Sequence, residues 1–281
     1  MVLAALGALR AGADIVTVAA PASVSREVQA LSANIIVRSL SSDRLCEADI
    51  PELKLLIKEH DCVVIGMGLG KGCDNVISHV VGLCDKVVID ADAITREVMS
   101  SLQNPKCDAH VIITPHAGEF RRLADLSKEL ESQCIDVSTL CARGVDYGNW
   151  HDIGNDNNSN NCTNYGNCEN YENKGHNIVT LLKGRIDIIS DGVMTRLNNT
   201  GNAGMTVGGT GDVLAGITGA LFARHDAFDA ACLAAFINGR AGDRAYDKYG
   251  TGLLATDLIE EIAGAMIITE DAVVKNIGVI E

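Results

Sequence analysis

Aromatic side chains and positive charge are both scarce in this chain. Phenylalanine, tyrosine and tryptophan make up 4% of the 281 residues. So few rings argue against the stacking platforms with which many proteins hold single-stranded RNA. The 23 Lys and Arg face 37 Asp and Glu, which gives a formal net charge of -14. Because such an acidic protein has no general attraction for nucleic acid or anionic membranes, we expect neither as a partner.

The sequence also lacks an uncharged membrane span, a signal peptide and paired cysteines. Its longest weakly charged stretch, 203–223, contains Asp212 and several glycines, which argues against a span. The apolar start, residues 1–6, has neither a basic region nor a cleavage site. Ten cysteines are scattered without a C-x-x-C pair. We therefore expect reduced thiols in a cytoplasmic protein.

What the sequence does contain is a regular alternation of buried strands and helices. With 47% hydrophobic residues it is long enough to bury one sizeable core. The expected strands cover residues 14–20, 34–38, 61–65, 86–90, 110–113, 178–184 and 185–190. The expected helices cover residues 2–11, 51–60, 75–82, 119–143, 227–249 and 256–266. This pattern predicts an α/β sandwich whose central sheet is largely parallel, with 61–65 as a central strand.

The glycine-rich stretch 202–216 is the most informative part of the sequence. Glycines without a Cβ let the backbone bend tightly toward a ligand, and the apolar residues that follow have helical spacing, so a helix should begin near Thr210 or Gly211. The free N–H groups and the dipole of such a helix favour an anion. The expected anion hole consists of Gly208, Gly209, Thr210 and Gly211.

Asp212 follows directly, in the first turn of that helix. A carboxylate is a poor choice beside a bound phosphate if anion binding is the only task. It suits the site if it moves a proton to or from a group held next to the phosphate. The alternative is that Asp212 only caps the helix and the glycines only form a turn.

Three further motifs follow expected strands, so they should meet at one edge of the sheet. The glycines of 66–70 indicate a ligand site or only a turn. Asp92 either caps a helix, or one acid of the pair Asp90 and Asp92 orders a polar substrate or a magnesium-bound water. The third motif is Thr114-Pro115-His116-Ala117-Gly118-Glu119-Phe120, and its position favours a ligand contact by His116.

The second half of the chain adds a hairpin and an unusual insertion. Strands 178–184 and 185–190 form the hairpin, and Lys183 either lies on the surface or reaches a nucleotide phosphate. Residues 149–177 are rich in Asn and poor in apolar side chains, which predicts a disordered surface insertion. Thr256 is the expected N-cap of the last helix. After Gly264 we expect a tail or an extra edge strand.

Five of these segments, in this order, resemble the ADP-dependent (6S)-NAD(P)H-hydrate dehydratase family of the ribokinase-like superfamily. They are 66–70, 88–93, 114–120, 182–184 and 200–216. The resemblance runs from about Leu3 to about Met266 without the insertion. It implies one ribokinase-like domain over 1–281, a three-layer sandwich with helices on both faces of the sheet. Members usually begin with a strand and a glycine-rich loop, ahead of the helix with which this sequence starts.

Members of that family remove water from the C6-hydrated nicotinamide ring of NADH or NADPH. ADP is the phosphoryl donor, AMP and phosphate are released, and Mg²⁺ is the expected cofactor. The resemblance implies Asp212 as the catalytic base and Gly68, His116 and Asp212 as contacts of the hydrated nucleotide. It implies an adenylate site formed by Lys183, Gly184, Arg185, Ile186, Asp187 and Gly211. It further implies a homo-oligomer such as a tetramer, with an epimerase domain or protein as a partner.

Two other functions fit the same motifs. A small-molecule kinase of the same fold, acting on a vitamin precursor or a sugar, would use the same glycine-rich helix start and the same lysine. The motif at 114–119 favours the dehydratase over this kinase. A protein that binds nucleotide without turning it over is the third alternative.

Overall fold

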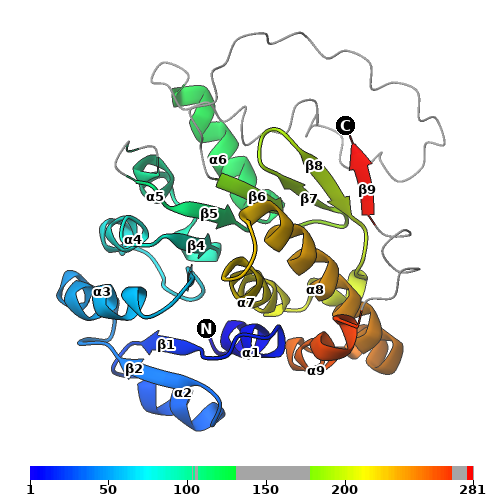
Figure 1. Cartoon of the computed structure of the whole chain (residues 1–281), viewed down its shortest axis with the longest axis horizontal. Coiled ribbons are helices and arrows are strands. Elements are labelled where there is room, and N and C mark those ends of the chain that lie inside the picture. The colour runs from blue at the N-terminus through cyan, green and yellow to red at the C-terminus, as the bar shows by residue number, and fades with distance from the viewer. Residues whose placement is uncertain (103, 105–106, 131–177, 268–276, 281) are drawn as a thin grey trace.

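The computed structural model describes residues 1–102, 104, 107–130, 178–267 and 277–280 (Figure 1). The expected insertion 149–177 and the end of the expected helix 119–143 lie outside these residues. The described strands form one seven-stranded sheet and one two-stranded sheet. No helix among the described residues is long and apolar enough to cross a membrane.

The seven-stranded sheet carries the strands of the expected sandwich in the order β3-β4-β5-β6-β7-β8-β9. Strands β3, β4, β5, β6 and β8 run in one direction, and β7 and β9 run in the other, so the sheet is mixed but mostly parallel. The strands are β3 (Val63–Ile65), β4 (Lys86–Ile89), β5 (His110–Ile113), β6 (Ile178–Leu182), β7 (Asp187–Ser190), β8 (Thr195–Asn198) and β9 (Ile277–Ile280).

Two sequence expectations about this sheet have different outcomes. The run 61–65 was expected at the centre, but β3 is the edge strand and pairs only with β4 among the described strands. A continuous apolar run therefore did not indicate a central position, and all three residues of β3 are only partly buried. The extra edge strand expected near the C-terminus is confirmed as β9, which pairs with β8.

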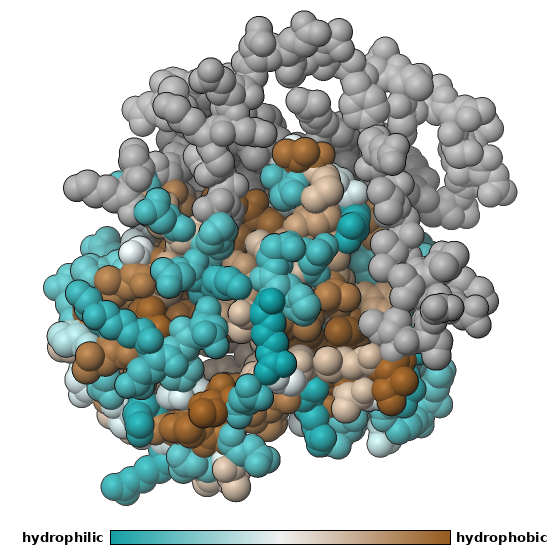
Figure 2. Space-filling view, viewed as in Figure 1, coloured by the Kyte–Doolittle hydropathy of each residue, from teal (hydrophilic) through white to brown (hydrophobic). Residues whose placement is uncertain are grey.

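A second, two-stranded parallel sheet is made by β1 (Thr17–Ala20) and β2 (Ile36–Ser39). It packs with α2 (Ser25–Leu31) and with Ala5 of the N-terminal helix around a small core. Among the described residues β1 and β3 do not pair, and Figure 2 shows the surface hollowed between the two sheets. The contact between this small sheet and the main body is partly polar. It includes a 2.9 Å hydrogen bond between the His60 ring and the Thr17 hydroxyl.

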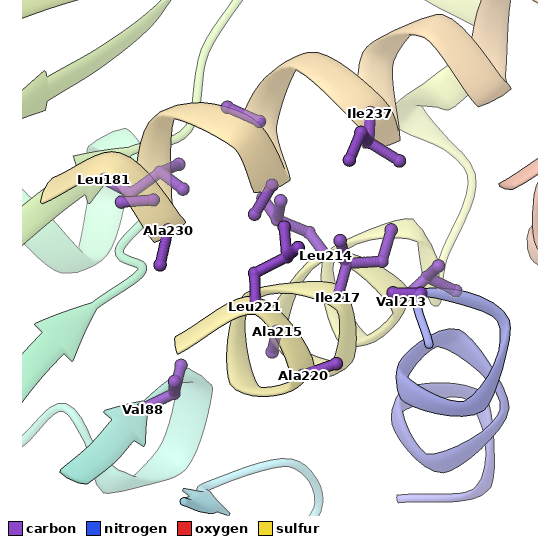
Figure 3. Close-up of a cluster of buried hydrophobic side chains, with 14 of the residues drawn as sticks. Val88, Leu181, Val213, Leu214, Ala215, Ile217, Ala220, Leu221, Ala230 and Ile237 are labelled. Atoms are coloured by element: carbon purple, nitrogen blue, oxygen red, sulfur yellow. The ribbon is translucent and has the colours of Figure 1, made fainter. Parts of the chain in front are cut away.

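Helices α1, α7, α8 and α9 cover one face of the main sheet (Figure 1). They are α1 (Val2–Arg10), α7 (Thr210–Phe222), α8 (Ala227–Tyr249) and α9 (Ala255–Ala265). In Figure 3, Leu214, Ile217 and Leu221 of α7 lie between Val88 of β4 and the overlying helix α8. Since β residues alternate between faces, Val88 points into this layer and its neighbours Val87 and Ile89 into the opposite one.

The opposite face is covered by a second set of helices (Figure 1). They are α3 (Ile50–Lys58), α4 (Asp74–Val81), α5 (Arg96–Ser101) and α6 (Ala117–Leu130). The three layers confirm the α/β sandwich that the alternating pattern predicts. Described cysteines in this layer and near it are free thiols, and burial raises the pKa of Cys62 and of Cys84 to about 12. Such thiols are unreactive packing groups.

Glycine sets how closely α7 approaches its neighbours. A Cβ built on Gly216 would lie 1.9 Å from the carbonyl oxygen of Ala4 in α1. A Cβ built on Gly219 would lie 2.3 Å from a methyl group of Val64 in β3. The missing side chains therefore let α7 contact a helix and a strand through its backbone. This contact fixes where the first turn of α7 lies.

The helix boundaries agree with the sequence pattern to within about two residues where both can be compared, but the pattern did not predict α2 and α5. Helix α8 covers the expected 227–249, and α7 begins at the expected Thr210. Helix α9 begins at Ala255, one residue before the expected N-cap Thr256, which is therefore wrong. The Asp257 carboxylate instead accepts a 2.8 Å hydrogen bond from the Leu254 N–H. Asp257 acts from the third position of the helix, where its carboxylate reaches back to the N-cap residue Leu254.

Candidate active site

The loops after β3, β4, β5 and β6 meet at the carboxyl edge of the sheet, beside the start of α7. The Lys183 N–H donates to the Pro115 carbonyl at 2.8 Å, and Lys183 forms a parallel bridge with His116. The Gly70 N–H donates to the Asp92 carboxylate at 3.0 Å. These bonds join neighbouring loops in pairs, so the expected meeting of the motifs at one edge is confirmed.

The loop that precedes α7 fixes the shape of the first turn of this helix. Gly209 is the N-cap in the left-handed region, with φ 98, and a Cβ there would lie 2.4 Å from Leu3. The Thr210 hydroxyl donates to the carbonyls of Met205 and Val207 at 2.8 and 3.2 Å. The hydroxyl of Thr210 thus braces the loop, and anion binding by the backbone N–H groups of the first turn stays a prediction.

Asp212 lies in that first turn, and its side chain is 34% exposed. Because Gly209 is the N-cap, the alternative reading of Asp212 as the cap is wrong. Burial raises the pKa of the Asp212 carboxyl, with Asp90 adding to the rise, whereas the Met1 ammonium and Lys183 lower it. The Met1 ammonium lies 3.9 Å from Oδ2. A half-buried carboxylate with a raised pKa is suited to accept a proton.

Lys183 reaches the same place from the end of β6. A Cβ built on Gly211 would lie 3.5 Å from the Lys183 ammonium, so this cation lies against the first turn of α7. The same ammonium lies 2.7 Å from Oδ1 of Asp90, which also accepts a 2.7 Å hydrogen bond from the Thr114 hydroxyl. Of the two alternatives for Lys183, a free surface lysine is wrong, because its side chain is 20% exposed and paired.

His116 has a structural task that the sequence analysis missed. Its Nδ1 accepts the N–H groups of Gly118 and Glu119 at 2.9 and 3.2 Å, so the imidazole caps α6. Glu119 returns the bond by accepting the His116 N–H at 2.8 Å, and its other oxygen lies 3.4 Å from Nε2. This reciprocal arrangement is a capping box with histidine in the place of serine. The ring is 58% exposed, and its contact with a ligand stays a prediction.

The turn 183–187 is closed by Asp187. Its two carboxylate oxygens accept the Gly184 N–H at 3.1 Å and the Asn198 amide at 3.0 Å. Burial raises the pKa of Asp187, and these hydrogen bonds counter the rise. Gly184 and Arg185 are exposed, and Ile186 is half-buried. The turn is therefore a rigid exposed edge beside Lys183, and its role in holding an adenylate stays a prediction.

The loop after β3 is shaped by glycines. A Cβ on Gly66 would lie 1.7 Å from the Asp90 carbonyl oxygen, so the two loops touch through their backbones. Gly68 has φ 72 and open space around it. Asp92 does not cap α5: Thr95 does, by accepting the Val98 N–H at 3.4 Å. The capping alternative for Asp92 is thus wrong, and Asp92 instead ties the loop through Gly70.

The side chains of the described residues do not form a metal-binding site by themselves. Among the described residues no group of three or more His, Cys, Asp or Glu side chains is arranged to hold a metal ion. The Asp90 oxygen nearest the site is already shared by Lys183 and Thr114. Mg²⁺ is commonly held by one or two carboxylates together with substrate phosphates and water. The described side chains alone therefore do not fit a resident magnesium ion.

The described residues thus form an α/β sandwich with a glycine-rich helix start, a paired lysine and a nearby carboxylate at one edge of the sheet. Residues 1–264 match the family model described as NAD(P)H-hydrate dehydratase. The chain belongs to the NAD(P)H-hydrate dehydratase family. This confirms the family that the five sequence motifs indicate.

Curated relatives agree with that assignment, and a solved structure shares the fold. An ADP-dependent (S)-NAD(P)H-hydrate dehydratase of Cenarchaeum symbiosum is 33% identical, over 94% of this chain and 83% of its own. A bifunctional NAD(P)H-hydrate repair enzyme of Archaeoglobus fulgidus is 39% identical, over 94% of this chain but 47% of its own, so the chain spans about half the length of such relatives. A ribokinase-like superfamily protein of Enterococcus faecalis has the same fold, with a TM-score of 0.66, 20% identity, and coverage of 94% and 81% of the two chains.

Sequence reasoning missed the partners of the expected site residues. Thr114 was noted as part of a motif, but its bond to Asp90 joins two loops 24 residues apart. Asn198, which holds Asp187, was not singled out at all. No spacing in the sequence signals either pair, because each bond depends on which strands are neighbours in the sheet.

Proposed function

We propose that this chain catalyses the ADP-dependent dehydration of (6S)-hydrated NADH and NADPH, releasing NAD(P)H, AMP and phosphate. The observation that carries the proposal is the Asp212 carboxylate in the first turn of α7, with the Lys183 ammonium against the same turn. An anion site and a proton acceptor side by side suit transfer of a phosphoryl group to a hydroxyl. The name of the Cenarchaeum symbiosum relative states this substrate and the dependence on ADP.

Asp212 starts the reaction by accepting the proton of the C6 hydroxyl. The hydroxyl oxygen then bonds to the β-phosphorus of ADP, and the bond between that phosphorus and the bridging oxygen of AMP breaks. The C6 oxygen is now part of a phosphate ester, and phosphate is a far better leaving group than hydroxide. The lone pair of the ring nitrogen expels phosphate, and loss of a proton from C5 restores the C5–C6 double bond.

The first turn of α7 supplies the electrostatic part of this step. Negative charge gathers on the oxygens of the transferring phosphoryl group. The amides of Gly208, Gly209, Thr210 and Gly211, together with the Lys183 ammonium, are preorganised to stabilise that charge. The adenylate is held, on this proposal, along 183–187 and Gly211. Gly68 and His116 contact the hydrated nicotinamide nucleotide from the neighbouring loops.

Mg²⁺ is expected to enter with the phosphates of ADP, because the described side chains do not form a metal site by themselves. When bound, it would neutralise charge on the phosphates. Titration of Mg²⁺ by calorimetry checks this expectation: heat of binding should appear with ADP present and be absent from the protein alone. Tight binding without nucleotide would contradict it.

Recovery of absorbance at the reduced-nicotinamide band tests the proposed function. The assay contains hydrated NADH, Mg²⁺ and either ADP or ATP. ADP-dependent recovery, with one AMP and one phosphate formed for each NADH, is the expected result. No recovery with the (6S) hydrate, under conditions in which AMP binds, would overturn the dehydratase and leave the nucleotide-binding protein.

The small-molecule kinase of the same fold remains the second candidate, because the anion site and the lysine serve it equally well. It predicts that a phosphorylated alcohol accumulates and that the nicotinamide hydrate is inert. An epimerase domain or protein as a partner of this chain stays part of the proposal, and some relatives are named bifunctional NAD(P)H-hydrate repair enzymes. A homo-oligomer such as a tetramer stays a prediction, which light scattering on a sizing column measures directly.

A further inference from the structure

Lys183 is held by two groups that have no part in the proposed reaction. Its ammonium is paired with Asp90, and the Thr114 hydroxyl donates to the same carboxylate oxygen. Asp90 is 1% exposed and Thr114 is fully buried. Burying a carboxylate with its cation gains little stability over well-packed apolar groups. A role in stability alone is therefore a weak reason for this arrangement.

The backbone around Asp90 is constrained on both sides. The loop after β3 touches the Asp90 carbonyl at Gly66, where any Cβ would clash. Ala91, the next residue, has φ 49, a left-handed conformation that is unfavourable for a residue other than glycine. Such strain persists where the surrounding structure over-determines the backbone. Both features hold the Asp90 carboxylate in one position.

Three neighbouring strands each supply one member of this group. Asp90 follows β4, Thr114 follows β5 and Lys183 follows β6. The group ends at the anion hole, since the ammonium lies 3.5 Å from a Cβ built on Gly211. Fixing a free lysine side chain costs rotamer freedom. When the side chain is fixed before the ligand arrives, that cost is removed from the chemical step.

We propose that Asp90 and Thr114 are positioning residues that hold the Lys183 ammonium at the first turn of α7, where it meets the phosphoryl group. The identity of that group rests on the proposed function, but the placement of Lys183 does not. Asp90 itself is not the proton acceptor: its side chain is 2% exposed and engaged by two donors, whereas the Asp212 side chain is 34% exposed.

The first test measures Lys183 chemically and needs no activity. Amine acetylation by acetic anhydride, read by peptide mass spectrometry, follows the accessible and deprotonated fraction of each lysine. In Asp90→Asn the rate at Lys183 should rise several-fold, because the amide no longer holds the ammonium in its mostly buried position and the amine becomes accessible to the reagent. The exposed Lys54 should react at its original rate. Thr114→Val should raise the Lys183 rate by a smaller factor, about twofold.

Asp92→Asn is the matched control, because it removes the same charge two residues away from an exposed carboxylate bound to Gly70. It should leave the Lys183 rate unchanged. Circular dichroism establishes that each variant is folded. If Asp90→Asn does not fold, Thr114→Val carries the test. An unchanged Lys183 rate in a folded Asp90→Asn, or in Thr114→Val when only that variant folds, overturns the proposal.

The second test asks whether Asp90 acts through Lys183. In the wild-type background Asp90→Asn should lower kcat at least tenfold and change the KM for ADP by less than about threefold. The reason is that a misplaced Lys183 ammonium stabilises the transition state less, while it affects the binding of ADP only slightly. In a Lys183→Met background the same substitution should have no further effect. Equal losses in both backgrounds would show that Asp90 only supports the fold. If wild-type protein does not dehydrate the hydrate, the proposed function fails, and the acetylation rates still decide the positioning role.

Discussion

The first turn of α7 and the body of the same helix use glycine for opposite purposes. At Gly208 in the turn region a Cβ would meet nothing within 4 Å, and at Gly211 it would meet only the Lys183 ammonium, at 3.5 Å. At Gly216 and Gly219 in the body a Cβ would overlap Ala4 or Val64. The open glycines leave room for a ligand, and the packed glycines let the backbone of α7 contact its neighbours. One helix thus anchors in the core and presents a free end to solvent.

The difference between packed and open glycines explains how the site can be rigid and still accessible to a ligand. Nearly the whole of α7 beyond the first turn is buried. Its contacts with α1, α8 and the sheet fix the helix axis, so the amides of the first turn are preorganised without side chains of their own. Rigid packing in the body and open space at the turn are therefore two parts of one arrangement, and the following predictions test each part.

The largest expected effect is on activity, from a change in the turn. Asp212→Asn should lower kcat roughly 10²–10⁴-fold, because the amide cannot accept the hydroxyl proton. AMP affinity and the melting temperature should stay close to the wild-type values, since asparagine has nearly the same shape. Steady-state kinetics and calorimetry measure the two quantities. Turnover within a few-fold of wild type would remove Asp212 as the base.

The next effect is on stability, from a change in the body. Gly216→Ala should destabilise the protein by roughly 3 kcal/mol, because the new methyl group would overlap the Ala4 backbone and push α1 away from α7. Denaturant unfolding measures the free energy.

Gly208→Ala is the control for Gly216→Ala, because it adds the same methyl group in open space. It should change the unfolding free energy by no more than about 0.5 kcal/mol. Equal losses in the two variants would break the distinction between packed and open glycines.

A third prediction concerns the pH dependence of the turn. Asp212 must be ionised to act as a base, and burial raises its pKa above the ordinary aspartate value of 3.8. Activity should therefore be complete above the raised pKa and be lost as the pH falls through it. The acid limb of kcat/KM should lie above pH 3.8. A limb at or below that pH would mean that the groups lowering the pKa, Lys183 and the Met1 ammonium, outweigh burial.

The smallest expected effect is a modest gain in stability near the turn. Ala91→Gly should stabilise the protein by about 0.5 kcal/mol, because relief of the left-handed strain exceeds the added entropy of the unfolded chain. The melting temperature should rise by roughly 1–2 °C. A lower melting temperature would mean that the strain at Ala91 is smaller than its backbone angle indicates.

The sequence by itself determined the fold class, the family and the start of α7. Local patterns carry that information: β-branched runs indicate strands, helical spacing indicates 227–249, and a glycine-rich turn before apolar residues indicates a helix start at Thr210. The order of motifs along the chain was enough to indicate the family, which the match over residues 1–264 confirms.

Only the tertiary structure decided which side chains meet. The Asp90–Lys183 pair joins residues 93 apart in sequence, and His60 bonds Thr17 over 43 residues. It also placed β3 at the sheet edge, separated the β1–β2 sheet and gave His116 its capping role. The physical reason is that strand order and loop contact arise from packing between distant segments. A pattern within one segment carries no information about its neighbours in space.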